Sequence, residues 1–136
     1  MRIQNRGSDW LIGPPRKPNA STMLICFPHG GGGATSYRKI MEAAGPDLDV
    51  IAVQLAGRGP RIHEPAIDSL VEVLNELVPV LVKTIDRPYA LFGHSVGALL
   101  AFECALRLEQ SVSEPPLGLF VSSYPDPACS IDDAPN

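Results

Sequence analysis

Residues 88–109, PYALFGHSVGALLAFECALRLE, decide the fold and the chemistry that this sequence predicts. The apolar run over 88–92 predicts a buried strand, and the periodicity of apolar residues over 97–109 predicts a helix. Between them, residues 93–97 read GHSVG, which is a Gly-x-Ser-x-Gly pattern. This pattern between a strand and a helix is typical of a serine nucleophile held on a sharp turn. We therefore predict that Ser95 is the catalytic residue.

The spacing of this motif has a physical reason. So tight a turn forces Ser95 into a strained backbone conformation, and side chains on Gly93 or Gly97 would collide with their neighbours. Gly93, His94 and Gly97 are therefore the expected supports of the turn. Because Ser95 precedes a helix, the free N–H groups of the helix N-terminus surround its hydroxyl. We expect the N–H of Val96 to stabilise a developing oxyanion.

A second glycine-rich segment, HGGGG over 29–33, follows the apolar strand predicted at 23–27. Proteins with the serine motif described above take their second oxyanion-hole donor from a loop at this position, and we expect Gly30 to provide it. A phosphate-binding loop would need a lysine that this segment lacks. A dinucleotide-binding G-x-G-x-x-G pattern would need a glycine where Thr35 or Ser36 stands. Neither nucleotide-binding alternative fits.

Strands and helices alternate along the chain. This order favours parallel strands joined by right-handed crossovers. We predict an α/β fold in one domain over 1–136, with a doubly wound, mostly parallel sheet and irregular ends at 1–20 and 122–136. Asp68 is the expected N-cap of the second helix, which Pro79 should kink. The predicted set is about four strands, at 23–27, 50–55, 88–92 and 117–121, and three helices, at 35–44, 68–83 and 97–109.

The composition limits the possible functions. The formal net charge is -4, and the 11 basic residues form no stripe, so nucleic-acid binding has no electrostatic basis. No apolar run approaches the roughly 20 residues of a membrane span, and residues 1–20 hold no signal-peptide core. The 3 cysteines are widely spaced without a CxxC pair, which indicates reduced thiols in a cytoplasmic protein without a metal.

Three blocks of the chain together resemble one family. They are CFPHGGGGATSYR at 26–38, AVQLAGRGPRIHEP at 52–65 and RPYALFGHSVGALLAFE at 87–103. Their order and spacing are similar to those of the type II thioesterases that accompany polyketide and nonribosomal peptide synthetases, members of the α/β-hydrolase superfamily. The resemblance runs from about Met23 to Val121 and covers the amino-terminal portion of that family only.

The resemblance implies a function. Type II thioesterases hydrolyse acyl groups held as thioesters on the phosphopantetheine arm of an acyl or peptidyl carrier protein, which rescues blocked synthetase modules. Ser95 would then form the acyl-enzyme, the carrier protein would be the partner, and no further cofactor is expected. His29, Gly31, Arg58 and Arg61 are expected near the mouth of the site. The acyl chain and the oligomeric state stay open.

The resemblance also implies an incomplete catalytic site. The family places its acid and its histidine in a further stretch of chain, and none of His29, His63 and His94 is a persuasive general base. Asp126 has no histidine to orient. We expect the chain alone to be nearly inactive, because loss of such a histidine costs a factor on the order of 10⁶ in turnover. Two alternatives stay open: a serine acyltransferase, and a catalytically inactive protein that binds carrier proteins.

Overall fold

The computed structural model describes residues 1–29, 33–112 and 114–122; the predicted irregular tail therefore lies, beyond Ser122, outside the described residues. Within these ranges, six strands form one sheet in the order β1-β2-β4-β3-β5-β6. The strands are β1 (Gln4–Ser8), β2 (Leu11–Gly13), β3 (Thr22–Phe27), β4 (Leu48–Val53), β5 (Tyr89–His94) and β6 (Leu119–Ser122). The helices are η1 (Ala34–Tyr37), α1 (Arg38–Ala43), η2 (Gly59–Arg61), α2 (Leu70–Thr84) and α3 (Val96–Ser111), of which η1 and η2 are short 3-10 helices.

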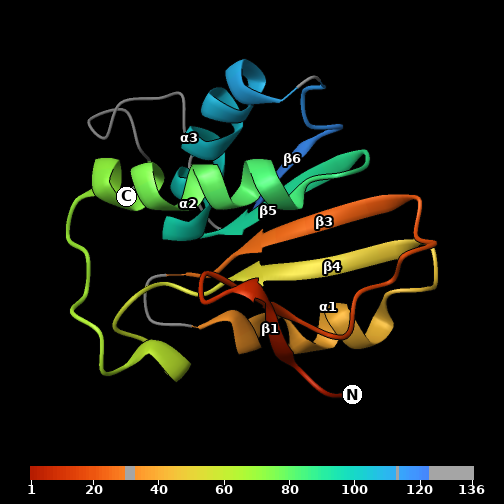
Figure 1. Cartoon of the computed structure of the whole chain (residues 1–136), viewed down its shortest axis with the longest axis horizontal. Helices are drawn as coiled ribbons and strands as arrows, with labels where there is room; N and C mark the ends of the chain where they lie inside the picture. The colour runs from red at the N-terminus through yellow and green to blue at the C-terminus, as the bar shows by residue number, and fades with distance from the viewer. Residues whose placement is uncertain (30–32, 113, 123–136) are drawn as a thin grey trace.

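The sheet is parallel at its centre and antiparallel at one edge. β3 pairs in parallel with β4 and β5, and β5 pairs in parallel with β6. β2 pairs antiparallel with both β1 and β4. Figure 1 shows α2 and α3 on one face of the sheet and α1 on the other. The predicted α/β fold with a mostly parallel, doubly wound sheet is confirmed.

Each face of the sheet buries its own apolar cluster. Successive side chains of a strand point to opposite faces, so β3 contributes Met23, Ile25 and Phe27 to the cluster under α2 and α3. The alternate residues, Leu24 and Cys26, pack in the cluster under α1. A strand buried on both faces needs apolar residues at every position. This is why these strands are recognisable in the sequence as continuous apolar runs.

The prediction of an irregular segment over 1–20 is wrong. β1 and β2 form an antiparallel pair that extends the sheet beyond β4, and residues 10–12 are buried. A buried ion pair fastens β1 to β4, because Arg6 donates to the two carboxylate oxygens of Asp49 at 2.8 and 3.2 Å. Asp49 is fully buried. Strands of three and five residues are too short to show a clear hydrophobic period.

The helix boundaries differ from the prediction by one or two residues, and the predicted helix at 35–44 divides into η1 and α1. Ser69, not Asp68, caps α2, because the Ser69 hydroxyl accepts a hydrogen bond from the N–H of Glu72 at 3.3 Å. α2 continues through Pro79 as one helix of 15 residues. α3 begins at Val96, directly after the serine of the motif. In the described part of the chain, no helix is long and apolar enough to cross a membrane.

Candidate active site

Ser95 lies at the turn between β5 and α3 in a strained conformation. Its φ is 57° and its ψ is -124°, and within the described chain it is the one residue other than glycine with a positive φ. Such a conformation costs about 1–3 kcal/mol and persists where surrounding contacts impose it. The Ser95 N–H donates to the carbonyl of Ser122 at 2.9 Å, and the Ser95 carbonyl accepts from the N–H of Ala98 at 2.9 Å. The strained turn predicted from the sequence is confirmed.

The two glycines of the motif are required by space. A β-carbon on Gly93 would lie 2.6 Å from the Cα of Ala98, which is closer than real β-carbons approach other atoms. A β-carbon on Gly97 would lie 2.5 Å from the carbonyl oxygen of Pro28 and closer still to that of Phe27. The first turn of α3 therefore packs directly against the backbone at the end of β3. This close packing gives a physical reason for glycine at both positions.

The N-terminus of α3 lies directly after Ser95, since the helix begins at Val96. The first N–H groups of a helix have no partner inside it, and the Ser95 side chain makes no capping hydrogen bond to them. Ser95 is half-buried, while the Val96 side chain is 55% exposed. Free N–H groups and the positive end of the helix dipole favour negative charge at this point. The arrangement can therefore stabilise an oxyanion beside Ser95.

Two of the three histidines meet beside this turn. The rings of His29 and His94, at the carboxyl ends of β3 and β5, pack edge to face with centroids 5.8 Å apart and planes at 68°. His63 is exposed in the loop after η2. Among the described residues, no hydrogen bond joins any of these imidazoles to Ser95. Within the described ranges, no histidine is thus hydrogen-bonded to Ser95 as the general base of a serine triad would be.

Gly30 and Gly31, predicted as an oxyanion donor and as part of the mouth of the site, lie outside the described residues. The chain on either side of them is described. His29 packs against His94, and the N–H of Ala34 donates to Oε1 of Gln54 at 3.2 Å. The described residues on either side of the glycine segment therefore contact His94 of β5 and Gln54, which directly follows β4.

Arg61, expected near the mouth of the site, is buried in the loop after β4, where its side chain contacts other parts of the protein. Its guanidinium lies 4.3 Å from the centre of the Trp10 ring. Nη1 donates to the carbonyl of Gln54 at 2.9 Å, and Nε and Nη2 donate to the Glu64 carboxylate at 2.8 and 2.9 Å. These hydrogen bonds hold the pKa of Glu64 below its usual range. Arg58 is half-buried, and its carbonyl accepts from Nε2 of Gln54 at 2.9 Å.

Sequence reasoning missed two buried polar residues near this site. The Tyr37 hydroxyl donates to the carbonyl of Phe27 at the end of β3, and burial raises the pKa of this hydroxyl. Gln54 is 1% exposed and follows β4 directly. A polar residue that directly follows a buried strand must find partners when it is itself buried. That rule was the available signal for Gln54.

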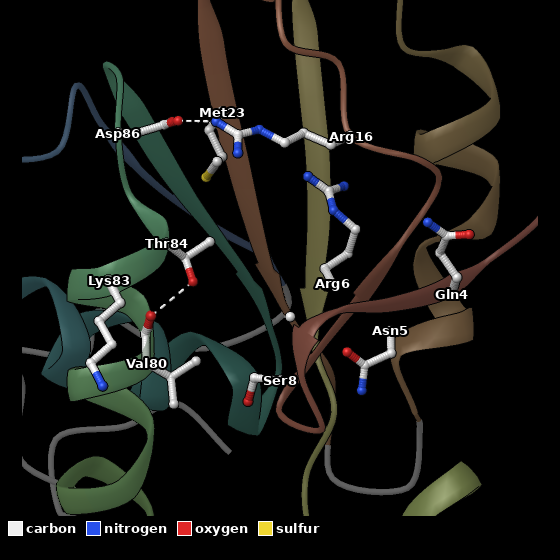
Figure 2. Close-up of a pocket in the computed structure, with 11 residues that line it drawn as sticks. Gln4, Asn5, Arg6, Ser8, Arg16, Met23, Val80, Lys83, Thr84 and Asp86 are labelled. Carbon is white, nitrogen blue, oxygen red and sulfur yellow. Dashed lines mark hydrogen bonds and ion pairs between the residues drawn. The ribbon is translucent and has the colours of Figure 1, made fainter.

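A cavity of about 710 Å³ lies in another part of the molecule. Figure 2 shows it between β1 and the last turns of α2, with the ion pair of Arg16 and Asp86 at one end. Among the described residues, none of those predicted for the site lines this cavity. Across residues 1–29, 33–112 and 114–122, no group of three or more His, Cys, Asp or Glu side chains could hold a metal ion. The turn at Ser95 therefore remains the candidate active site.

A doubly wound sheet with a strained serine between a parallel strand and a helix is typical of the α/β-hydrolase class. The comparison with protein families narrows this class. The family model described as "Thioesterase domain" matches residues 22–136. The chain belongs to the thioesterase domain family.

Similar proteins include two that are named thioesterases. The medium-chain S-acyl fatty acid synthase thioesterase of Homo sapiens is 39% identical over 109 residues, which are 79% of this chain and 41% of that protein. Linear gramicidin dehydrogenase LgrE of Brevibacillus parabrevis is 35% identical over 134 residues, 95% of this chain and 51% of that protein. The solved structure of BorB, a type II thioesterase from the borrelidin biosynthetic cluster, superimposes with a TM-score of 0.80 at 42% identity, covering 88% of this chain and 50% of BorB. The chain thus spans about half the length of the relatives it matches.

Proposed function

We propose that this chain carries the nucleophile of a thioesterase that removes acyl groups from the phosphopantetheine arm of acyl or peptidyl carrier proteins. One observation carries the proposal: Ser95 is held at φ 57° between β5 and the N-terminus of α3. A strained residue persists where function requires it and its surroundings impose it. Membership of the thioesterase domain family supports a thioester as the bond that is cleaved.

The proposed reaction has two steps. The Ser95 oxygen attacks the thioester carbonyl, a carbon–oxygen bond forms, the carbon–sulfur bond breaks, and the phosphopantetheine thiol leaves with a proton. Water then cleaves the acyl-serine ester and releases the acid. The N–H of Val96, together with the N–H of Gly30, would bind the carbonyl oxygen while it carries negative charge. In comparable sites, each such donor lowers the activation barrier by about 3 kcal/mol.

The partner class follows from the relatives. One similar structure is a type II thioesterase from a biosynthetic cluster, and one relative is a thioesterase of fatty acid synthase. Both names support a substrate that is presented as a thioester. His29 and Arg58 remain candidates for the mouth of the site. We propose that the chain alone turns over slowly, because none of the described histidines is hydrogen-bonded to Ser95.

The name of LgrE suggests a dehydrogenase as a competing function. A dinucleotide fingerprint on the glycine segment would require glycine at Thr35 or Ser36. The carboxyl side of that segment enters the 3-10 helix η1, whereas a dinucleotide site uses the N-terminus of a long helix. The residues of this chain therefore favour acyl transfer to a serine over hydride transfer.

A fluorophosphonate probe tests the proposal directly. We expect the 136-residue chain to be labelled slowly at Ser95, on prolonged incubation with excess probe. The Ser95→Ala variant should resist labelling, and the Ser111→Ala variant should be labelled at the rate of the parent chain. Ser111 is an exposed serine at the other end of α3 and is the matched control. Labelling that survives in Ser95→Ala, or an unlabelled parent chain, contradicts the assignment of the nucleophile.

An acyl-loaded carrier protein then separates the remaining alternatives. Release of free acid supports the hydrolase, whereas transfer of the acyl group to an added thiol or amine supports a serine acyltransferase. Binding of the carrier protein without labelling of Ser95 supports the catalytically inactive binding protein. Titration calorimetry with the unloaded carrier protein measures that binding independently of turnover.

A further inference from the structure

Gln54 uses both ends of its side-chain amide to join two segments of the chain. Oε1 accepts the N–H of Ala34 at 3.2 Å, and Nε2 donates to the carbonyl of Arg58 at 2.9 Å. Ala34 is the first residue of η1, at the carboxyl side of the glycine segment, and Arg58 directly precedes η2. The Gln54 side chain is 1% exposed. A buried amide with both functions satisfied fixes its two partners relative to each other.

Gln54 is itself held firmly. Its backbone N–H donates to the carbonyl of Trp10 at 2.8 Å, and its carbonyl accepts from Nη1 of Arg61 at 2.9 Å. It also follows the last residue of β4, a strand at the centre of the sheet. A side chain on so rigid a backbone position can define where a loop lies.

The space around this amide leaves little room for other arrangements. A β-carbon on Gly59 would lie 3.1 Å from Nε2 of Gln54, and one on Gly33 would lie 3.5 Å from Oε1. Both loops therefore approach the amide closely, one from each side. Glutamate at position 54 could accept from Ala34 but could not donate to Arg58 when ionised. The site thus requires a side chain with both a donor and an acceptor.

We infer that Gln54 is a positioning residue, which couples the carboxyl end of the glycine segment to the loop that holds Arg58. The inference rests on the proposed function, because the same segment begins at His29, whose ring packs against His94 next to Ser95. The segment is attached beside the nucleophile at one end and to Gln54 at the other. Gln54 acts on the reaction through the positions of these loops and does not touch the substrate.

Two variants separate the two hydrogen bonds. Gln54→Met removes both, whereas Gln54→Glu keeps an acceptor for Ala34 and removes the donor to Arg58. Tyr89→Phe is the matched control, because it also removes a side-chain hydrogen bond of a buried residue, the partly buried bond from the Tyr89 hydroxyl to the carbonyl of Glu114 at 3.2 Å. Tyr89 begins β5, at the end opposite to Ser95.

The first measurement is amide hydrogen exchange in the full chain. In Gln54→Met, we expect exchange to become about tenfold faster at both Ala34 and Arg61, because the loops open more often once the amide is lost. The N–H of Arg61 reports on the second loop, since it donates to the carbonyl of Arg58 at 2.9 Å. Gln54→Glu should accelerate exchange at Arg61 more than at Ala34. Unchanged exchange at either amide in Gln54→Met overturns the coupling.

The second measurement is the rate of fluorophosphonate labelling. We expect the maximal labelling rate of Gln54→Met to fall roughly 10- to 100-fold, the range expected for a misplaced catalytic group, with a smaller change in the concentration for half-maximal rate. Tyr89→Phe should label at the parent rate. If Gln54→Met is labelled as fast as the parent chain, the positioning role is overturned, even if amide exchange in this variant is faster. An unlabelled parent chain contradicts the proposed function, while the exchange rates still decide whether Gln54 couples the loops.

Discussion

A β-carbon placed on Gly97 would lie 2.5 Å from the carbonyl oxygen of Pro28. This relationship joins the first turn of α3 to the chain that leaves β3, two segments almost seventy residues apart in a sequence of 136. Because of this contact, the N-terminus of α3 lies close to Pro28, the residue before the glycine segment. The glycines of the motif are therefore needed for packing between elements as well as for the turn itself.

The first prediction concerns this contact. Gly97→Ala should lower the free energy of unfolding by about 2–3 kcal/mol, because the backbone at Pro28 must move to accept the methyl group. Gly45→Ala is the control, since a β-carbon there meets no atom within 4 Å, and its effect should stay within about 0.5 kcal/mol. Urea unfolding of both variants measures the difference. Equal stabilities would show that the close contact does not exist in solution.

The second prediction concerns the strain at Ser95. Ser95→Gly should be more stable than Ser95→Ala by about 1 kcal/mol, because glycine accepts a φ of 57° without a steric cost whereas alanine does not. Both variants lack the hydroxyl and should resist fluorophosphonate. Thermal unfolding of the pair at one pH gives the comparison. A less stable glycine variant would mean that the turn is relaxed rather than strained.

The third prediction concerns the ion pair that fastens the amino-terminal strands. Asp49→Asn should destabilise the chain by about 3 kcal/mol, because it leaves the Arg6 guanidinium buried without its counter-charge. Glu42→Gln, which removes the exposed partner of Arg38, should change stability by less than about 0.5 kcal/mol. Urea midpoints of both variants test this. If the two substitutions cost the same, the pair of Arg6 and Asp49 is solvated and not buried.

The fourth prediction concerns the two buried thiols. Burial raises the pKa of Cys26 and of Cys104 from 9.0 to about 12, so almost no thiolate forms in the folded chain at pH 8. Iodoacetamide should therefore modify these cysteines only when urea unfolds the chain, as read from the peptides that contain them. Because the folded pKa values are the higher ones, stability should fall as the pH rises from about 9 toward 12. Rapid modification of either cysteine in the folded chain would contradict this.

Much of the site could be predicted from the sequence, because local physics fixes it. The Gly-x-Ser-x-Gly motif between an apolar strand and a helix places Ser95 on a strained turn, and the structure shows that turn with φ 57°. The same reasoning predicted the steric need for Gly93 and Gly97. It did not predict that the side chain of Arg61, in the loop after β4, is buried against Trp10. An arginine can lie in either place, and only its tertiary neighbours decide which.

By itself, the sequence determined the order of strands and helices from 22 onward, the parallel core of the sheet and the position of the strained turn at Ser95. These features depend on runs of apolar residues and on one short motif, which are local properties of the chain. Only the tertiary structure decided that residues 4–13 extend the sheet, that His29 meets His94, and that Gln54 joins two loops. Each of these depends on a polar or charged side chain finding a partner far away in the sequence. Local periodicity carries no information about that partner, since the free energy of the pair comes from burial and geometry that exist only in the folded chain.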